Sequence, residues 1–201
     1  MGSTATAWSA DQRALVDAAL DALQGSDEVD FSITDVVERA GSNRAALYAS
    51  FGSKDRLLLA AVAEAVRRTV AAADGHLQGA STPAAGLEAW VRVLLGRAGD
   101  PTASAWTLPF ALNANRLLHR FPEAEHSIRL PLRQQLSALL PADTAEPPEQ
   151  IAEAIFAMVM NVQAMHIARG TKIPAADVDV YVRCALRIAG LPPSGTGPAR
   201  R

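Results

Sequence analysis

The sequence predicts an all-α protein of two domains. Apolar residues make up 49% of its 201 residues, with Ala foremost among them, and Ala is the strongest helix former. Val and Ile never alternate with polar residues in runs bounded by turns, so no sheet is predicted. Proline recurs just before apolar segments, the position in which it opens helices. Together these observations predict about nine helices.

The first helix is predicted over residues 9–24. Ser9 and Gln12 have the spacing of a capping box. The apolar residues after them recur at helical spacing and predict one buried stripe; they are Leu15, Val16, Ala19 and Leu23. Gly25 ends the helix, and we expect residues 1–8 to be frayed.

Residues 32–58 predict two short helices, a tight turn between them, and the start of a third. Ser32 caps the first with Asp35 three residues on, the capping-box spacing again. Gly41 suits a left-handed stop, and Asn43 restarts the chain as a good N-cap. The turn is therefore about three residues long, which is a helix-turn-helix spacing.

The second short helix carries small side chains and a few polar ones on its outer side. Leu47, with Phe51 just past the end, faces inward. The residues left on or near the outer side are Asn43, Arg44, Ala45, Ala46, Tyr48 and Ser50. Such a surface suits a helix that enters a DNA major groove about 12 Å wide.

A third helix, predicted over residues 54–73, begins after Gly52 with Ser53 as its cap. Lys54 lies in its first turn, where a cation is unfavourable for the helix dipole. We therefore expect Lys54, with the backbone N–H groups beside it, to bind a phosphate. The helix is too long for the N-terminal domain alone and should link it to the second domain.

The stretch AGSNRAALYASFGSKDRLL, residues 40–58, resembles the signature of the TetR-type one-component transcriptional regulators. The resemblance is dense over residues 11–73, and the helix layout is compatible to about residue 190. It implies that Arg44, Ala45 and Ala46 lie at base edges. It also implies that DNA phosphates are contacted by Tyr48, Ser50, Lys54 and the helix start formed by Ser32–Thr34. Ser42, Ala49 and Ser50 depart from the usual family residues but leave the spacing intact.

Charge is unevenly distributed along a chain whose net charge is −2. Residues 11–38 hold eight acids against Arg13, whereas residues 39–68 hold six bases against Asp55 and Glu64. Positive charge thus gathers on the segment with the proposed reading helix, as a localised DNA contact requires. A solvated face of mixed charge is the alternative.

Later helices are predicted at 83–96, 101–119, 122–140, 148–169 and 174–190, with Pro109 and Pro131 kinking or dividing two of them. Residues 1–74 form the predicted DNA-binding domain with its linking helix, and residues 75–201 the ligand-binding and dimerisation domain.

The last two helices are apolar nearly all round. We predict a homodimer interface there, made by Ile155, Met158, Val162, Val178, Val182 and Ala185. The alternative is that these are core helices.

A pocket for a small, mostly apolar effector is predicted in the second domain. Aromatic and amide side chains among apolar residues suit such a site; the candidates are Trp90, Trp106, Phe110, Asn113 and Asn161. The alternative is that the tryptophans belong to the core and the asparagines to the surface.

Together with the family resemblance, these observations predict a cytoplasmic, ligand-responsive repressor that binds a palindromic double-stranded DNA operator. No cofactor, metal or membrane partner is expected: Cys184 is the only cysteine, and we find no signal peptide and no membrane-spanning run. An enzyme is not expected, because Glu123 and His126 form only one of the two pairs that a di-iron bundle needs. The alternatives are a helical metal-binding or catalytic bundle, and a protein-interaction adaptor whose head binds no DNA.

Overall fold

The computed structural model describes residues 8–24, 31–96, 116–117, 119–144 and 146–193. These residues form eight helices and no strand, which confirms the all-α prediction. The helices are α1 (Ala10–Gln24), α2 (Ile33–Arg39), α3 (Arg44–Phe51), α4 (Lys54–Leu77), α5 (Pro83–Gly96), α7 (Pro122–Ser137), α8 (Pro148–Ala168) and α9 (Ala175–Ile188).

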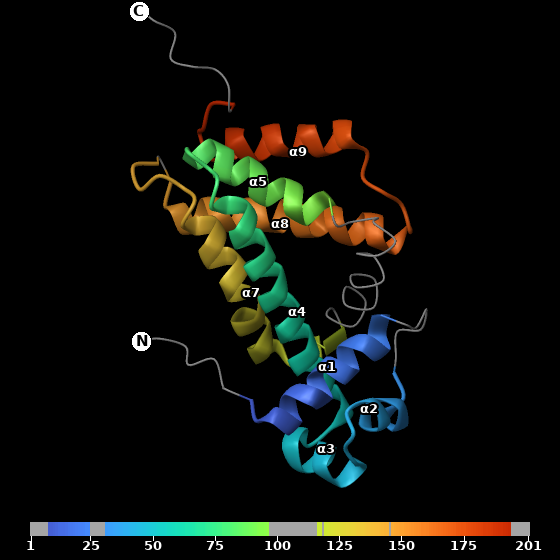
Figure 1. Ribbon diagram of the computed structural model, residues 1–201. Helices are drawn as coiled ribbons and strands as arrows, with labels where there is room; N and C mark the ends of the chain where they lie inside the picture. The colour runs from blue at the N-terminus through green and yellow to red at the C-terminus, as the bar shows by residue number, and fades with distance from the viewer. Residues whose placement is uncertain (1–7, 25–30, 97–115, 118, 145, 194–201) are drawn as a thin grey trace, which may run out of the picture.

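The helices are arranged in a small head, a long connection and a larger body (Figure 1). Helices α1, α2 and α3 pack together at one end of the molecule, and α5, α8 and α9 lie across the other end. Helix α4 runs from the head into the body with α7 beside it. The reading helix predicted from sequence is α3, which lies at the tip of the head.

Two separate apolar cores hold these parts together. The head core gathers fully buried side chains from α1, α2, α3 and the start of α4; they include Leu15, Leu20, Val36, Leu47 and Leu57. The body core gathers side chains from α5, α7, α8 and α9; they include Leu87, Trp90, Leu136, Ile155 and Val182. Apolar burial of this kind is the main favourable term in folding, so each core stabilises its own group of helices.

Helix α4 belongs to both cores. Its first half buries Leu57 and Leu58 in the head, and its second half packs Val70 and Leu77 against the body. It contains 24 residues, which at 1.5 Å per residue is a length of about 36 Å. It extends past the predicted end at residue 73. The body also reaches into the head, because Leu117 and Ile128 are buried in the head core.

The structure corrects the end of one predicted helix and describes only part of another. Helix α7 continues through Pro131 without division and ends at Ser137 rather than at residue 140. Of the helix predicted over 101–119, only 116–117 and 119 are described, and these are helical. Helix α8 is long and apolar enough to cross a membrane by length and composition, although no such segment was expected. Its Ile155, Phe156 and Val159 are instead buried in the body core.

Candidate nucleic-acid interface

The turn between α2 and α3 follows from its capping residues. Ser32 Oγ accepts a hydrogen bond from the Asp35 N–H at 3.4 Å, and Asn43 Oδ1 accepts one from the Ala46 N–H at 2.9 Å. Between the two helices Gly41 takes the left-handed conformation with φ 59°, which glycine adopts without steric cost. The Ser42 N–H then donates to the Val37 carbonyl at 2.8 Å. These bonds fix the direction in which α3 leaves the turn.

Helix α3 is anchored by one side and exposed on the other. Leu47 is 0% exposed in the head core, whereas Tyr48 is 46% exposed. Asn43, Arg44 and Ala45 are exposed as predicted, and Ala46 and Ser50 are half-buried at the edge of this face. The exposed face therefore combines small side chains with one Arg and one Tyr, which lets the backbone approach a groove closely.

Arg44 contacts the start of α2. Its Nη2 donates a hydrogen bond to Thr34 Oγ1 at 2.7 Å. The family resemblance implied separate sites for the two residues, Arg44 at bases and Thr34 at phosphates; the structure brings them together. Thr34 is half-buried, and Ser32, two residues before it, is exposed.

The start of α4 lies next to the end of α3. Ser53 Oγ accepts the Arg56 N–H at 3.2 Å, which confirms the predicted cap. Lys54 is half-buried, with its Nζ 5.0 Å from the centre of the Phe31 ring. This cation–π contact holds the ammonium group beside the helix start, close to the backbone N–H groups that could donate hydrogen bonds to a phosphate.

Both acids within the basic segment are paired with arginines. Asp55 lies against Arg116 and Arg120. Glu64, only 7% exposed, accepts hydrogen bonds from Arg67 at 2.5 and 2.6 Å and from Arg68 at 2.8 Å. The positive charge of this segment is therefore partly committed to the protein itself.

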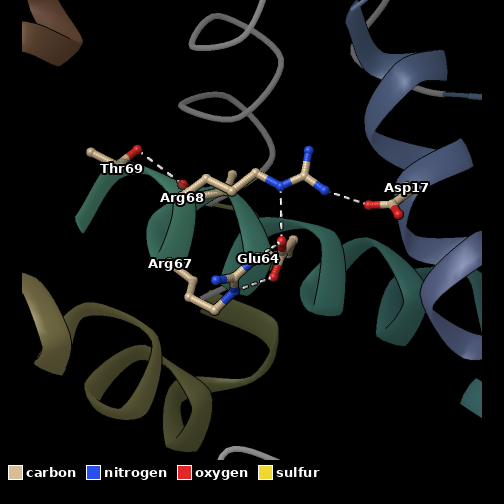
Figure 2. A network of polar contacts seen from close by, with 6 residues as sticks. Asp17, Glu64, Arg67, Arg68 and Thr69 are labelled. Carbon is tan, nitrogen blue, oxygen red and sulfur yellow. Dashed lines mark hydrogen bonds and ion pairs between the residues drawn. The ribbon is translucent and has the colours of Figure 1, made fainter. Parts of the chain in front are cut away.

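Figure 2 shows the Glu64 cluster joining α4 to α1. Arg68 bonds Glu64 through Nε and reaches Asp17 of α1 through Nη2. The pKa of Glu64 lies below its ordinary value of 4.5, chiefly because Arg67 donates to the carboxylate, and also because Arg68 does; together they outweigh the opposing effect of burial. Glu64 thus stays ionised and holds both arginines on one side of the helix.

Two of the five predicted pocket residues, Trp90 and Asn161, lie among the described residues. Trp90 is fully buried in the body core, where its indole N–H donates to Gln135 Oε1 at 3.0 Å. Asn161 is exposed on α8. Trp106, Phe110 and Asn113 lie outside the described residues. Trp90 therefore belongs to the core and Asn161 to the surface, which is the alternative to a pocket for these two residues.

A hollow of about 550 Å³ lies between the C-terminal ends of α4 and α5. Its lining residues are Ala72, His76, Ala89, Arg92, Val93 and Gly96. It is apolar except for the imidazole and the guanidinium, and Arg92 is paired with Asp179 of α9 at 2.7 Å. None of these residues was predicted from the sequence, because the hollow arises only where two helices meet.

The predicted dimer residues lie mostly inside a single chain. Ile155, Val162, Val178, Val182 and Ala185 are buried in the body core, and Met158 is half-buried. The five buried side chains have almost no surface left for a second copy, so that assignment is corrected in favour of the core alternative. The large apolar residues that the same two helices do expose are Met165, Val180 and Ile188.

Among the described side chains, no group of three or more His, Cys, Asp and Glu residues could hold a metal ion. The side chain of His126 lies outside the described set. What the described residues present is an exposed helix, α3, with basic groups beside it.

Comparisons with known proteins agree with this geometry. Residues 15–61 match the model of a family described as bacterial regulatory proteins, tetR family. The chain is 28% identical over 191 residues to the HTH-type transcriptional regulator BetI of Rhizobium meliloti, covering 89% of this chain and 91% of that protein. It is 27% identical over 194 residues to BetI of Brucella suis, covering 90% and 93%.

A solved structure shares the fold over nearly the whole chain. The transcriptional regulator RHA1_ro04179 from Rhodococcus sp. Rha1 superposes with a TM-score of 0.66 at 23% identity. The match covers 90% of this chain and 99% of that one. The likeness therefore includes the body as well as the head.

Proposed function

Since the chain belongs to the TetR family of transcriptional regulators, we propose that it is a cytoplasmic repressor that a small effector releases from its operator. Like its relatives, it is a DNA-binding regulator and not an enzyme. The observation that carries the proposal is the outer face of α3. It is exposed, narrow and held by the buried Leu47, with Arg44 at its start.

In the proposed complex α3 enters the major groove. Arg44 reads a base edge, with Ala45 and Ala46 permitting the close approach. Tyr48, Ser50, Lys54 and the start of α2 at Ser32 and Thr34 bind the flanking phosphates, which fixes the register of the helix on the duplex. Asn43 caps α3 and lies at the edge of the same surface.

The proposed dimer forms through the outer faces of α8 and α9. Met165, Val180 and Ile188 are the large apolar side chains exposed there. Pairing of two copies about a two-fold axis would cover them. It would also present two α3 helices to successive major grooves, about 34–36 Å apart, and so require a palindromic operator.

The effector site we propose is the hollow between α4 and α5. Its apolar walls suit a largely apolar molecule, and His76 and Arg92 supply polar groups that would orient it. A ligand there would contact α4 directly and shift it relative to the body. A coupling of about 100-fold between DNA and effector affinity corresponds to about 2.7 kcal/mol, an ordinary size for such a protein.

Selection of bound sequences from a random DNA pool at near-physiological salt tests the proposal. The expected result is a palindrome with half-sites about one helical turn apart. Recovery of nothing above background would contradict DNA binding and leave α2 and α3 as a packing unit. Recovery of a single, non-repeated half-site would contradict the dimer alone.

A further inference from the structure

Asp55 is a carboxylate placed where the proposed function needs positive charge. It lies two residues after the cap Ser53, in the first turn of α4, directly after Lys54. A carboxylate there suits the helix dipole but repels a DNA phosphate bound at the same helix start. Charges within about 8 Å of each other are little screened at physiological salt. An unpaired Asp55 would therefore weaken DNA binding.

Two arginines from the other half of the chain cover this carboxylate. Arg116 Nη2 lies 3.7 Å from Asp55 Oδ1, and Arg120 Nη1 forms an ion pair with Asp55 Oδ2. The Asp55 side chain is 19% exposed, whereas both arginines are more than half exposed. Arg116 and Arg120, four residues apart in the sequence, thus both face the same carboxylate. Together the three side chains carry a net charge of +1.

The arginines are held in place by apolar contacts on either side. Leu117 is 1% exposed in the head core, and Phe121 packs against the same core. The Phe121 N–H donates to the Leu117 carbonyl at 2.7 Å. Leu117 and Phe121 are thus docked on the head although they lie just before α7 of the body. The pairing of Asp55 persists only while this docking lasts.

We propose that Arg116 and Arg120 determine DNA affinity by neutralising Asp55, so that the body supplies part of the charge of the DNA-binding surface. The proposal rests on the proposed function. With the segment docked, the start of α4 presents Lys54 and its backbone N–H groups to a phosphate beside a compensated carboxylate. When the segment moves away, the same helix start presents a bare negative charge and DNA affinity falls.

A mutant cycle tests this proposal. The proteins are the wild type, Arg116→Gln/Arg120→Gln, Asp55→Asn, and the triple variant. The probes are a labelled duplex recovered by selection from the random pool and an unrelated duplex of the same length, each at low and near-physiological salt. Arg169→Gln, at the end of α8, is the matched control. Circular dichroism checks that every variant stays folded.

The double variant is expected to bind both duplexes about tenfold more weakly, a change equal to about 1.4 kcal/mol. Asp55→Asn alone should bind as tightly as the wild type or more tightly. The triple variant should regain most of the loss, because no carboxylate is left to neutralise. Arg169→Gln should change nothing.

One contrary result is that the two arginine substitutions weaken DNA binding equally in the wild-type and in the Asp55→Asn background. That result would overturn the proposal, because the arginines would then act on DNA directly or through folding. An unchanged double variant would overturn it too. If the wild type binds neither duplex, the proposed function itself fails, and this inference with it. The first two outcomes leave the proposed function standing, so the two failures are distinguishable.

Discussion

Arg44 is held in position before DNA is present. Its hydrogen bond to Thr34 joins the start of α3 to the start of α2, so one rotamer of a long side chain is already favoured. Ordering a side chain of this kind on binding costs about 0.5–1.5 kcal/mol. A pre-positioned guanidinium reduces that cost and keeps its remaining N–H groups in a fixed fork. The fork matches the two acceptors of a guanine.

Two substitutions of Arg44 can distinguish its effect on base discrimination from the effect of its charge on general DNA affinity. Arg44→Ala is expected to lose about 1–3 kcal/mol of binding to the selected operator and to relax its preference at one base pair. Arg44→Lys, the matched control, keeps the charge but not the fork. It should retain binding to unrelated DNA and still lose the discrimination. Fluorescence anisotropy with operator variants measures both. Full discrimination by Arg44→Lys would contradict base reading by this residue.

Glu64 makes a second prediction at this scale. Its pKa is lowered in the folded state, chiefly by the hydrogen bonds from Arg67. The folded state therefore binds its proton less readily than the unfolded state. The stability that Glu64 contributes is present above its ordinary pKa of 4.5 and is lost as the pH falls through the lower folded-state value.

Glu64→Gln should lower the free energy of unfolding by about 1–2 kcal/mol at pH 7, because Arg67 loses its charged acceptor and Arg68 keeps only Asp17. The difference from the wild type should shrink as the pH falls below 4.5. Urea unfolding across this pH range measures it. The exposed Glu38→Gln serves as control, with a change within about 0.5 kcal/mol expected. A difference independent of pH would exclude the charge of Glu64 as the cause.

At the scale of elements, Gln135 joins three helices. From α7 it accepts the indole N–H of the buried Trp90 on α5. Its Nε2 donates to the Val70 carbonyl at 3.1 Å and to Asp74 Oδ1 at 2.7 Å, both on α4. One amide therefore uses its acceptor on α5 and its donors on α4. This fixes the second half of α4 against the body at the point where an effector-driven shift would act.

Gln135→Leu should destabilise the protein by about 1–3 kcal/mol, because the Trp90 N–H would be left buried without an acceptor. Gln134→Leu, at the exposed neighbouring position, is the matched control and should be nearly neutral. The urea concentrations at the unfolding midpoints measure this difference, provided that the free energy of unfolding depends on urea concentration with the same slope in both variants. Equal midpoints for the two variants would show that the bridge adds no net stability.

The elements that could be predicted from the sequence are those with local signals. Ser9, Ser32, Asn43 and Ser53 each cap a helix that begins where the sequence places it. Gln135 and Arg116 had no such signal. Their partners lie more than 40 residues away, and sequence spacing does not specify which distant helices meet. The apolar pattern of α8 could not distinguish a dimer face from a core face, because both require the same residue types.

For the whole molecule, the proposed dimer would combine two heads into one operator-binding unit. Linking two binding heads raises the apparent affinity far beyond that of either. The apolar surface that α8 and α9 leave exposed, at Met165, Val180 and Ile188, is where we expect the two copies to meet.

Val180→Glu should convert the dimer into monomers, because pairing would bury an uncompensated carboxylate. Operator affinity should fall more than tenfold while the head stays folded. Ala71→Glu, at an exposed position of α4, is the control and should remain dimeric. Sedimentation velocity gives the oligomeric state. A Val180→Glu protein that sediments like the wild type would place the interface elsewhere.

The buried positions of Leu117 and Ile128 bear on how the chain folds. The head core is completed only by Leu117 and Ile128, which follow the end of α3 at Phe51 by 66 and 77 residues. Helix α4 cannot bury its two halves until both cores have assembled. Heating should therefore melt head and body in one transition rather than two. A fragment cut after residue 74 would expose the sites that Leu117 and Ile128 fill, so we expect the head alone to be less stable than the head within the whole chain.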